Sequence, residues 1–472
     1  MKKRQFLEAL AGIVGGEHLV TDAAQMAPAL VDWRGRYTGR ALALARPGCT
    51  AEVVAIVRLC LAYAVPMVPQ GGNTGLCGGA TPDDSGDALV IQLCRMRRIR
   101  AIDPANNTLV AEAGATLAEV RAAAQEAGRL FPLWLASGGS AQIGGNLSTN
   151  AGGVHVLRYG TMRDLTLGVE AVLPNGECLP APNLLRKNNT GYDLKHLLVG
   201  AEGTLGIITA AALKLFAPPQ SETLGWLGLA SPAAAVALLE RTRGRFAAGL
   251  TAFELISPRA LQLVYQHVPD MPRVFDAPWH VLVELGTWTE DEEGAALREA
   301  AERFWATEME SGRILDAILA RTPAQARKLW ALREHISEAQ RREGVSVKHD
   351  IALPISRIPE FLEQVEPLLA RAFPGIRHVT FGHLGDGNLH FNLSHADPAA
   401  NTRLLAHAEE INRIVYDLVH HLSGSISAEH GLGQLKRETI RRYKSPPELA
   451  AMQSIKTALD PKGLMNPGKL LP

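Results

Sequence analysis

Glycine is concentrated in three short segments of this chain, and no other feature of the sequence constrains the fold as strongly. Residues 69–80, 137–153 and 200–206 hold 14 of the 44 glycines in only 36 residues. Glycine lets the backbone approach an anion closely, and consecutive N–H groups can converge on phosphate oxygens. Each segment lies next to a predicted strand. We therefore interpret the three segments as phosphate-binding loops.

The common nucleotide-binding signatures are absent from these loops. The G-x-G pairs of the chain are Gly385/Gly387 and Gly431/Gly433, and neither continues to the third glycine of GxGxxG. GxxxxGK[ST] does not occur. The sequence therefore disfavours both a Rossmann NAD site and a P-loop NTPase.

Composition excludes other classes of protein. The 472 residues allow roughly three domains. Lys+Arg and Asp+Glu are both 48, which argues against a nucleic-acid binder that relies on a general basic field. The five cysteines form no CxxC pair, so neither a disulfide framework nor a cysteine zinc site is indicated.

No apolar run approaches the length of about 18 residues that a membrane span needs. The basic N-terminus is followed by an apolar stretch that Glu8 interrupts, which favours an amphipathic first helix over a signal peptide. We expect a cytoplasmic protein.

The second half of the chain has its own organisation. Pro218 and Pro219 mark a boundary, because neither a helix nor a central strand continues through them. Residues 322–342 are predicted to form one long helix, with Pro323 at its first position.

Two histidines flank the strongest hairpin signal of the sequence, in FGHLGDGNLHFNL. A two-residue turn at Asp386 and Gly387 predicts that His383 pairs with His390 across the hairpin. Both imidazoles would then project from one face, with Asn392 beside them, since the strand period is two. This arrangement suits two ligands of a divalent cation, although two partly exposed histidines are the simpler interpretation of the hairpin alone.

A second segment, SAEHGLGQLK, offers Glu429 and His430 in a glycine-flanked turn. Two histidines and one glutamate are a common catalytic ligand set for Zn²⁺, with one position left open for substrate. HExxH is absent, so a zinc protease is not indicated.

The three glycine-rich segments belong to three longer motifs. These are PQGGNTGLCGG, IGGNLSTNAGGVHVLRYG and NNTGYDLKHLLVGAEGTLGIIT. They resemble the FAD-binding half of the vanillyl-alcohol-oxidase/PCMH flavoprotein superfamily, and more narrowly the D-2-hydroxyglutarate and cytochrome-type D-lactate dehydrogenases. The resemblance implies an α+β fold with a two-part PCMH-type FAD-binding domain at 1–217. A substrate (cap) domain with an antiparallel sheet and the metal-binding hairpin would follow at 218–424. Residues 425–472 would complete the active site and return to the FAD domain.

The resemblance also implies which residues hold FAD. The first loop carries Asn73 and no histidine, so the flavin is expected to be bound non-covalently. The expected FAD-binding residues are Pro69, Gly71, Gly72, Asn73, Thr74, Gly75, Leu76, Gly138, Gly144, Gly145, Asn146, Thr149, Asn150, Gly152, Gly153, Glu202, Gly206, Ile207 and Asn466.

In the same family, a divalent metal, here expected to be zinc, would be bound by His383, His390 and Glu429. His430 would be the catalytic base. The substrate-binding residues carried over by the resemblance are Arg333, Ser337, Lys348, Asn392 and His430. An additional Arg and Lys are surplus for lactate and suit a second carboxylate. The sequence VKHD around Lys348 departs from the YKYD type expected of the family.

The predicted activity is FAD-dependent, metal-assisted oxidation of a D-2-hydroxy acid to a 2-oxo acid, with D-2-hydroxyglutarate as the first choice of substrate. A D-lactate dehydrogenase and a glycolate-oxidase-type subunit are the alternatives, and a flavin-free metal-dependent hydrolase is the remote one. Electrons would pass to electron-transfer flavoprotein or a quinone-linked carrier. No nucleic-acid partner is expected, and a homodimer is a possible assembly.

Overall fold

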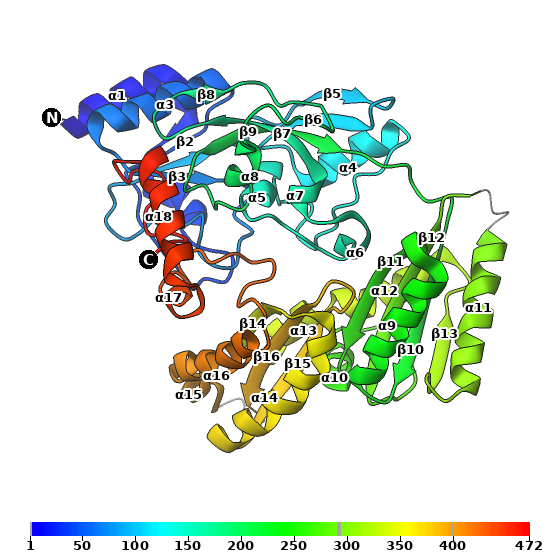
Figure 1. The fold of residues 1–472 in the computed structure, drawn as a ribbon. Coiled ribbons are helices and arrows are strands. Elements are labelled where there is room, and N and C mark those ends of the chain that lie inside the picture. Colours follow the sequence, from blue (N-terminus) through cyan, green and yellow to red (C-terminus); the bar gives the residue numbers. More distant parts are fainter. Residues whose placement is uncertain (1, 290–293, 396, 398–399) are drawn as a thin grey trace. The chain divides into compact units, whose positions relative to one another are not determined.

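The computed structural model describes residues 2–289, 294–395, 397 and 400–472, and it divides into two compact units (Figure 1). The first unit comprises Met1–Gly152, Gly160–Ala217 and Glu429–Pro472. The second comprises Gly153–Tyr159 and Pro218–Ala428. Helices and largely antiparallel sheets in both units confirm the α+β class. None of the described helices combines the length and apolar character that a membrane span requires.

The first unit contains two sheets. Their strands are β1 (Leu19–Val20), β2 (Ala43–Ala45), β3 (Met67–Gln70), β4 (Leu89–Gln92), β5 (Ile99–Asp103), β6 (Thr108–Glu112), β7 (Thr166–Val172), β8 (Cys178–Leu179) and β9 (Ile207–Lys214). The four-stranded sheet has the order β1-β2-β4-β3, and β4 pairs in parallel with both of its neighbours. The five-stranded sheet is antiparallel, in the order β5-β6-β9-β7-β8.

Helices surround these sheets in the first unit. They are α1 (Lys2–Val14), α2 (Ala23–Met26), α3 (Thr50–Tyr63), α4 (Leu117–Glu126), α5 (Ile143–Ser148), α7 (Met162–Leu165), α8 (Leu194–Leu198), α17 (Ile440–Tyr443) and α18 (Pro446–Leu459). The apolar stripes of α1 and α3 share one core with the four-stranded sheet, through residues such as Leu10, Ile56 and Leu89. This burial explains why α1 is a stable part of the fold.

The second unit is built on one seven-stranded antiparallel sheet. Its strands are β10 (Ser221–Leu229), β11 (Leu250–Ile256), β12 (Trp279–Thr287), β13 (Asp316–Leu319), β14 (Val347–Ala352), β15 (Ile376–His383) and β16 (Asn388–His395). Its helices are α6 (Val156–Tyr159), α9 (Pro232–Phe246), α10 (Pro258–His267), α11 (Ala295–Glu310), α12 (Pro323–Glu334), α13 (Ile336–Glu343), α14 (Ile358–Ala372), α15 (Asn401–Ala406) and α16 (Ala408–His421). The strand order is β13-β10-β12-β11-β15-β16-β14.

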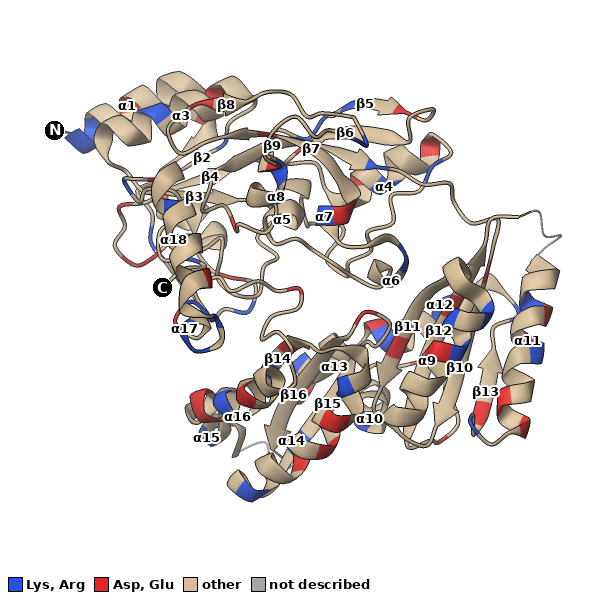
Figure 2. Ribbon diagram, viewed as in Figure 1, with Lys and Arg blue, Asp and Glu red and all other residues tan. Residues whose placement is uncertain are grey.

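Helices α10, α12 and α13 pack on the sheet of the second unit. Leu261, Leu332 and Ile336 from these helices share a core with Leu282 and Phe381 from the strands. The outer helices carry both signs of charge, as Figure 2 shows along α11 and α14. Apolar side chains of α10, α12 and α13 therefore shield core residues of the sheet such as Phe381 from water.

The long helix predicted over 322–342 is interrupted. Helix α12 begins at Pro323 as predicted, and Thr322 caps it, since its side chain accepts a hydrogen bond from Gln325 N–H. The helix ends at Glu334, and α13 begins at Ile336. The ring Nδ1 of His335 lies 2.7 Å from the carbonyl oxygen of Ala331, so a side chain as well as the backbone uses this carbonyl at the break.

The register predicted for the histidine hairpin is wrong by two residues. Phe381, and not His383, lies opposite His390. A two-residue type I′ turn needs positive φ at both positions, whereas Gly387 has a φ of 90° and Asp386 does not enter that region. The N–H groups of Asp386 and Gly387 both donate to the carbonyl of His383 at 3.1 Å, which closes a longer connection. Because side chains alternate along a strand, a shift of two keeps both histidines on the predicted face.

The close approach at Gly387 can be tested separately from its backbone conformation. A Cβ at Gly387 would lie 2.3 Å from the carbonyl oxygen of Leu353, whereas one at Gly312, also with positive φ, meets nothing within 4 Å. Gly312→Ala should cost about 1–2 kcal/mol through its left-handed backbone alone. Gly387→Ala should cost about 1–3 kcal/mol more because of the clash. Thermal unfolding of both variants measures this difference, and equal losses of stability would contradict it.

Candidate functional site

The first glycine-rich loop follows β3 and presents a run of backbone donors. No residue in the described part of the chain accepts a hydrogen bond from the N–H groups of residues 71–76. These residues are partly or fully exposed, so their donors are available to water or to a ligand. Asn73 adopts a left-handed conformation with a φ of 52°. Successive free donors around such a residue form an anion-binding concavity.

The second loop packs tightly against the first. A Cβ at Gly72 would lie 1.9 Å from the carbonyl oxygen of Ser140, so only glycine permits this approach. Two buried polar atoms here lack a partner among the described residues, namely Oε1 of Gln142 and Nδ2 of Asn146. Buried polar groups are normally paired. The orphaned atoms, together with the free donors of 71–76, fit the pyrophosphate and polar groups of FAD.

Several polar side chains that are predicted to bind the cofactor form hydrogen bonds within the protein instead. Asn73 Nδ2 donates to the carbonyl of Val31 at 2.8 Å, and Asn150 Oδ1 accepts from the N–H of Arg163 at 2.8 Å. Thr149 donates back to a carbonyl of α5. These contacts hold the loops in shape, so the backbone of these residues is what the loops offer to a ligand.

The third loop places Glu202 against the C-terminal segment of the same unit. Its carboxylate accepts the N–H groups of Leu432 and Gly433, both at 2.7 Å. Burial raises the pKa of Glu202, although these two N–H groups oppose that rise. Asn466 Nδ2 donates to the carbonyl of Glu202 at 2.7 Å, and its buried Oδ1 has no partner in the described structure. Glu202 therefore holds the turn that follows Glu429 and His430.

The remaining predicted FAD residues are backbone positions around these loops. Gly144, Gly206 and Ile207 are buried, whereas Pro69, Thr74 and Gly138 are partly exposed. Gly152 ends the first part of the first unit, and Gly153 begins the short segment of the second. Gly71, Gly75, Leu76 and Gly145 lie within the loops already described.

The second unit brings His383 and His390 together. Their ring centroids are 6.1 Å apart, and a ring nitrogen of each lies within 4.8 Å of one on the other. His383 is buried, and His390 is partly exposed. The register directs both side chains to one face of the sheet, where they could hold a divalent metal.

A buried carboxylate orients His383. Glu254 on β11 lies directly opposite His383, with its Oε1 2.6 Å from the ring Nδ1. Burial alone would raise the pKa of Glu254, but His383 and Arg333 lower it to about 2. An ionised carboxylate only accepts hydrogen bonds, so Nδ1 of His383 carries the proton. Nε2 is then the ring nitrogen with the lone pair that a metal ligand needs.

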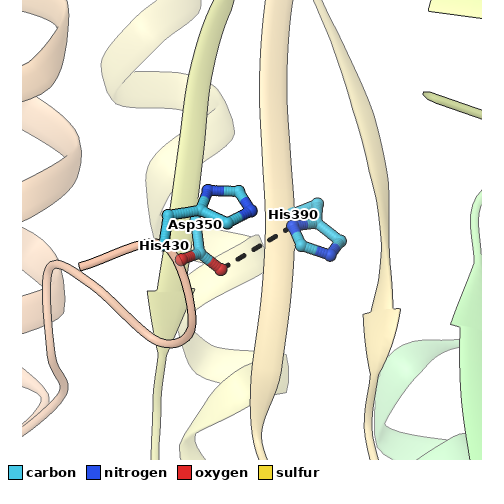
Figure 3. A group of neighbouring side chains, drawn as sticks. All are labelled: Asp350, His390 and His430. Atoms are coloured by element: carbon cyan, nitrogen blue, oxygen red, sulfur yellow. Dashed lines mark ion pairs between the residues drawn. The ribbon is translucent and has the colours of Figure 1, made fainter. Parts of the chain in front are cut away.

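Asp350 lies near the ring of His390. Figure 3 shows Asp350 and His390 from neighbouring strands, with 3.7 Å between Asp350 Oδ1 and the ring Nδ1. Asn388 also donates to Asp350, at 3.0 Å. Nδ1 of His383 lies at hydrogen-bond distance from its carboxylate, the usual support of a metal-binding histidine, whereas 3.7 Å places Asp350 near the His390 ring but beyond that distance. The figure also draws His430, which follows Ala428 by two residues.

The predicted substrate residues of the second unit lie on neighbouring elements. Arg333 on α12 is buried, and its Nε donates to Glu254 at 2.7 Å. Lys348 on β14 lies opposite Asn392 on β16. Asn392 Nδ2 donates to Gln340 Oε1 at 2.9 Å, and Ser337 on α13 is exposed.

Glu429 and His430 begin the last part of the first unit, directly after Ala428. The N–H of Ala428 lies 3.3 Å from the carbonyl oxygen of Asp350. Because consecutive Cα atoms are about 3.8 Å apart, the chain itself keeps Glu429 close to this anchor.

Sequence reasoning missed the carboxylates that lie beside the histidines. Asp350 stands two residues after Lys348 in VKHD, so the strand period places both side chains on one face once β14 is recognised. Glu254 is distant in sequence, and only the pairing of β11 with β15 brings it to His383. Gln142 precedes α5, and no sequence motif marks it as a residue that faces the first loop.

Comparison with known proteins agrees with this geometry. Residues 218–470 match the family described as FAD linked oxidases, C-terminal domain, and residues 41–181 match the FAD binding domain. A D-2-hydroxyglutarate dehydrogenase from Xanthomonas citri pv. viticola is 39% identical over 93% of this chain and 91% of that protein. The mitochondrial D-2-hydroxyglutarate dehydrogenase of Bos taurus is 38% identical over 99% and 83%. Substrate-bound p-cresol methylhydroxylase shares the fold, with a TM-score of 0.76 at 15% identity over 99% of this chain and 96% of that one.

The fold and the two matched domains therefore define a flavin-dependent oxidoreductase. The chain belongs to the family of FAD-linked oxidases, and its cofactor is FAD. The resemblance inferred from the glycine-rich motifs is confirmed.

The contact between Gly72 and Ser140 provides a test of the FAD loops. Gly72→Ala should release most of the FAD, because the added Cβ separates the two loops that would hold it. Gly139→Ala is the matched control, since a Cβ there meets nothing within 4 Å. The measurement is flavin absorbance per folded protein after gel filtration, with folding checked by circular dichroism. Equal FAD content in the two variants would contradict the prediction.

Proposed function

We propose that this chain oxidises a D-2-hydroxy acid to a 2-oxo acid with the help of FAD and a divalent metal, and that D-2-hydroxyglutarate is its substrate. One observation carries the proposal: His383, which the buried Glu254 supports, shares a sheet face with His390, and Arg333 bonds the same Glu254 through its Nε. The names of the relatives from Xanthomonas citri pv. viticola and Bos taurus support this choice of substrate.

The proposed metal ligands are His383, His390 and Glu429, and the proposed metal is zinc. The donor set supports this choice, because two imidazoles and one carboxylate leave a position open for substrate. Glu429 follows Ala428, whose bond to Asp350 ties the chain to the strand beside His390. When bound, FAD supplies the hydride acceptor and the metal supplies the Lewis acid.

The chain's own residues would then bind and orient the acid. The hydrogen bond from Arg333 to Glu254 uses Nε, so both Nη groups can face a carboxylate of the substrate. Lys348 and Asn392 are paired across β14 and β16 and would hold the same end of the substrate, and Ser337 on α13 is the further proposed substrate-binding residue. A guanidinium and an ammonium suit the second carboxylate of a dicarboxylic acid.

His430 is the proposed base. An imidazole accepts a proton efficiently near neutral pH, so it would take the proton of the substrate hydroxyl. The turn after His430 is held by the bonds of Glu202 to Leu432 and Gly433. This anchoring would keep the base in position during turnover.

The alternatives differ in substrate or cofactor. A D-lactate dehydrogenase or a glycolate-oxidase-type subunit would use the same flavin and metal but would not need both Arg333 and Lys348. A flavin-free hydrolase is disfavoured by the FAD binding domain. The proposal includes electron-transfer flavoprotein or a quinone-linked carrier as acceptor, a cytoplasmic location and a homodimer.

Anaerobic spectroscopy tests the proposed reaction. D-2-Hydroxyglutarate added to the metal-replete protein should bleach the flavin band, because the substrate hydride reduces the flavin. L-2-Hydroxyglutarate is the control and should leave the band intact. Bleaching by D-lactate but not by D-2-hydroxyglutarate would contradict the substrate and favour the lactate alternative.

Metal removal tests the histidine–glutamate site. A zinc chelator should slow bleaching by D-2-hydroxyglutarate at least about 100-fold, since the Lewis acid contributes several kcal/mol to the reaction. The flavin band itself should persist, and added Zn²⁺ should restore the rate. Unchanged bleaching in a sample shown to be free of metal would contradict the proposed metal.

A further inference from the structure

Glu254 lies on the central strand of the second unit, and the proposed function places it neither among the metal ligands nor among the substrate-binding residues. Its side chain is fully buried, and each carboxylate oxygen has its own partner. Oε1 lies 2.6 Å from Nδ1 of His383, and Oε2 accepts from Nε of Arg333 at 2.7 Å. One buried charge is thus shared between a proposed metal ligand and a proposed substrate-binding residue.

We propose that Glu254 is a positioning residue that couples metal affinity to recognition of the substrate's second carboxylate. This inference rests on the proposed function, since it takes His383 as a metal ligand and Arg333 as a carboxylate binder. It adds one element to that function: the two subsites share the same counter-charge.

Glu254 acts on the proposed metal site through its hydrogen bond to the His383 imidazole. Pairing of β11 with β15 sets Glu254 directly opposite His383, so the ring is held by the sheet itself. A hydrogen bond from Nδ1–H to a carboxylate fixes the tautomer and makes Nε2 a stronger ligand. Loss of such a partner typically weakens metal binding by about 10–100-fold.

Glu254 acts on the proposed substrate site through its hydrogen bond to the Arg333 guanidinium. Its central carbon lies 4.8 Å from the ring centroid of Phe381, and its Nε is bonded to Glu254. These two contacts fix the plane of the group and leave the Nη edge for a carboxylate. The two hydrogen bonds depend on each other, because His383 and Arg333 share the negative charge of one carboxylate.

The chain provides a matched control in Glu308 on α11. Its side chain is also fully buried, and it is bonded to two arginines, Arg241 and Arg313. Neither arginine belongs to the proposed site. Glu308→Gln therefore reproduces the loss of a buried, doubly paired carboxylate without touching the histidines.

The experiment compares Glu254→Gln with Glu308→Gln in the full-length FAD-loaded protein. Zn²⁺ affinity is measured by competition with a chromophoric chelator, and KM is measured with D-2-hydroxyglutarate. Glu254→Gln should weaken zinc binding about 10–100-fold and raise KM. Glu308→Gln should lower the melting temperature and leave both values unchanged.

A second variant separates coupling from simple structural support. Arg333→Met leaves Glu254 to His383 alone, so zinc affinity should become severalfold tighter while KM rises. A purely structural role of Glu254 would instead loosen zinc binding in Arg333→Met as well. This variant also keeps the proposal testable if Glu254→Gln does not fold.

The outcomes distinguish a failure of the proposed metal site from a failure of the role proposed for Glu254. Wild-type protein that binds no Zn²⁺ would overturn the proposed metal site, and the role of Glu254 with it. Wild-type protein that binds Zn²⁺, with unchanged affinity in folded Glu254→Gln or with unchanged or weakened affinity in Arg333→Met, would overturn the role of Glu254 alone.

Discussion

The burial of the Glu254 charge is the interaction on which the second unit depends. An ionised carboxylate removed from water costs several kcal/mol unless it is paired and hydrogen-bonded. Glu254 meets this requirement with one partner from β15 and one from α12, so a strand and a helix must both be in place. The same pairing delivers an oriented imidazole and an oriented guanidinium to one face of the sheet. Stability and the chemistry of the site thus share one electrostatic cause.

The first unit also buries a carboxylate, and backbone N–H groups bind it. Glu202 is buried, and it is satisfied by two N–H groups of the C-terminal segment rather than by a cation alone. That contact joins residues more than two hundred positions apart, and it holds the turn that begins with Glu429 and His430. Buried carboxylates therefore organise both the flavin-binding unit and the unit with the histidine pair.

The histidine hairpin shows how far a local pattern reaches. The Asp386–Gly387 pair correctly predicts a reversal of the chain and a shared face for His383 and His390. It does not predict the register, because the turn type depends on the φ of Asp386 and on the tight contact of Gly387 with Leu353. The face is preserved because the shift is even, so the proposed ligand pair tolerates this error where an odd shift would have removed it.

The sequence by itself determined the flavin loops, since glycine clustering and close backbone approach are local properties of residues such as Gly72. It also determined the histidine pair, because strand periodicity needs only neighbouring residues. Only the tertiary structure decided what supports them. Glu254 and His383 are 129 positions apart in the sequence, and the pairing of their strands brings them together. Packing of the second loop places Gln142 against the first loop. Long-range partners of buried charges leave no periodic trace in a sequence, because their positions are set by sheet order and not by spacing along the chain.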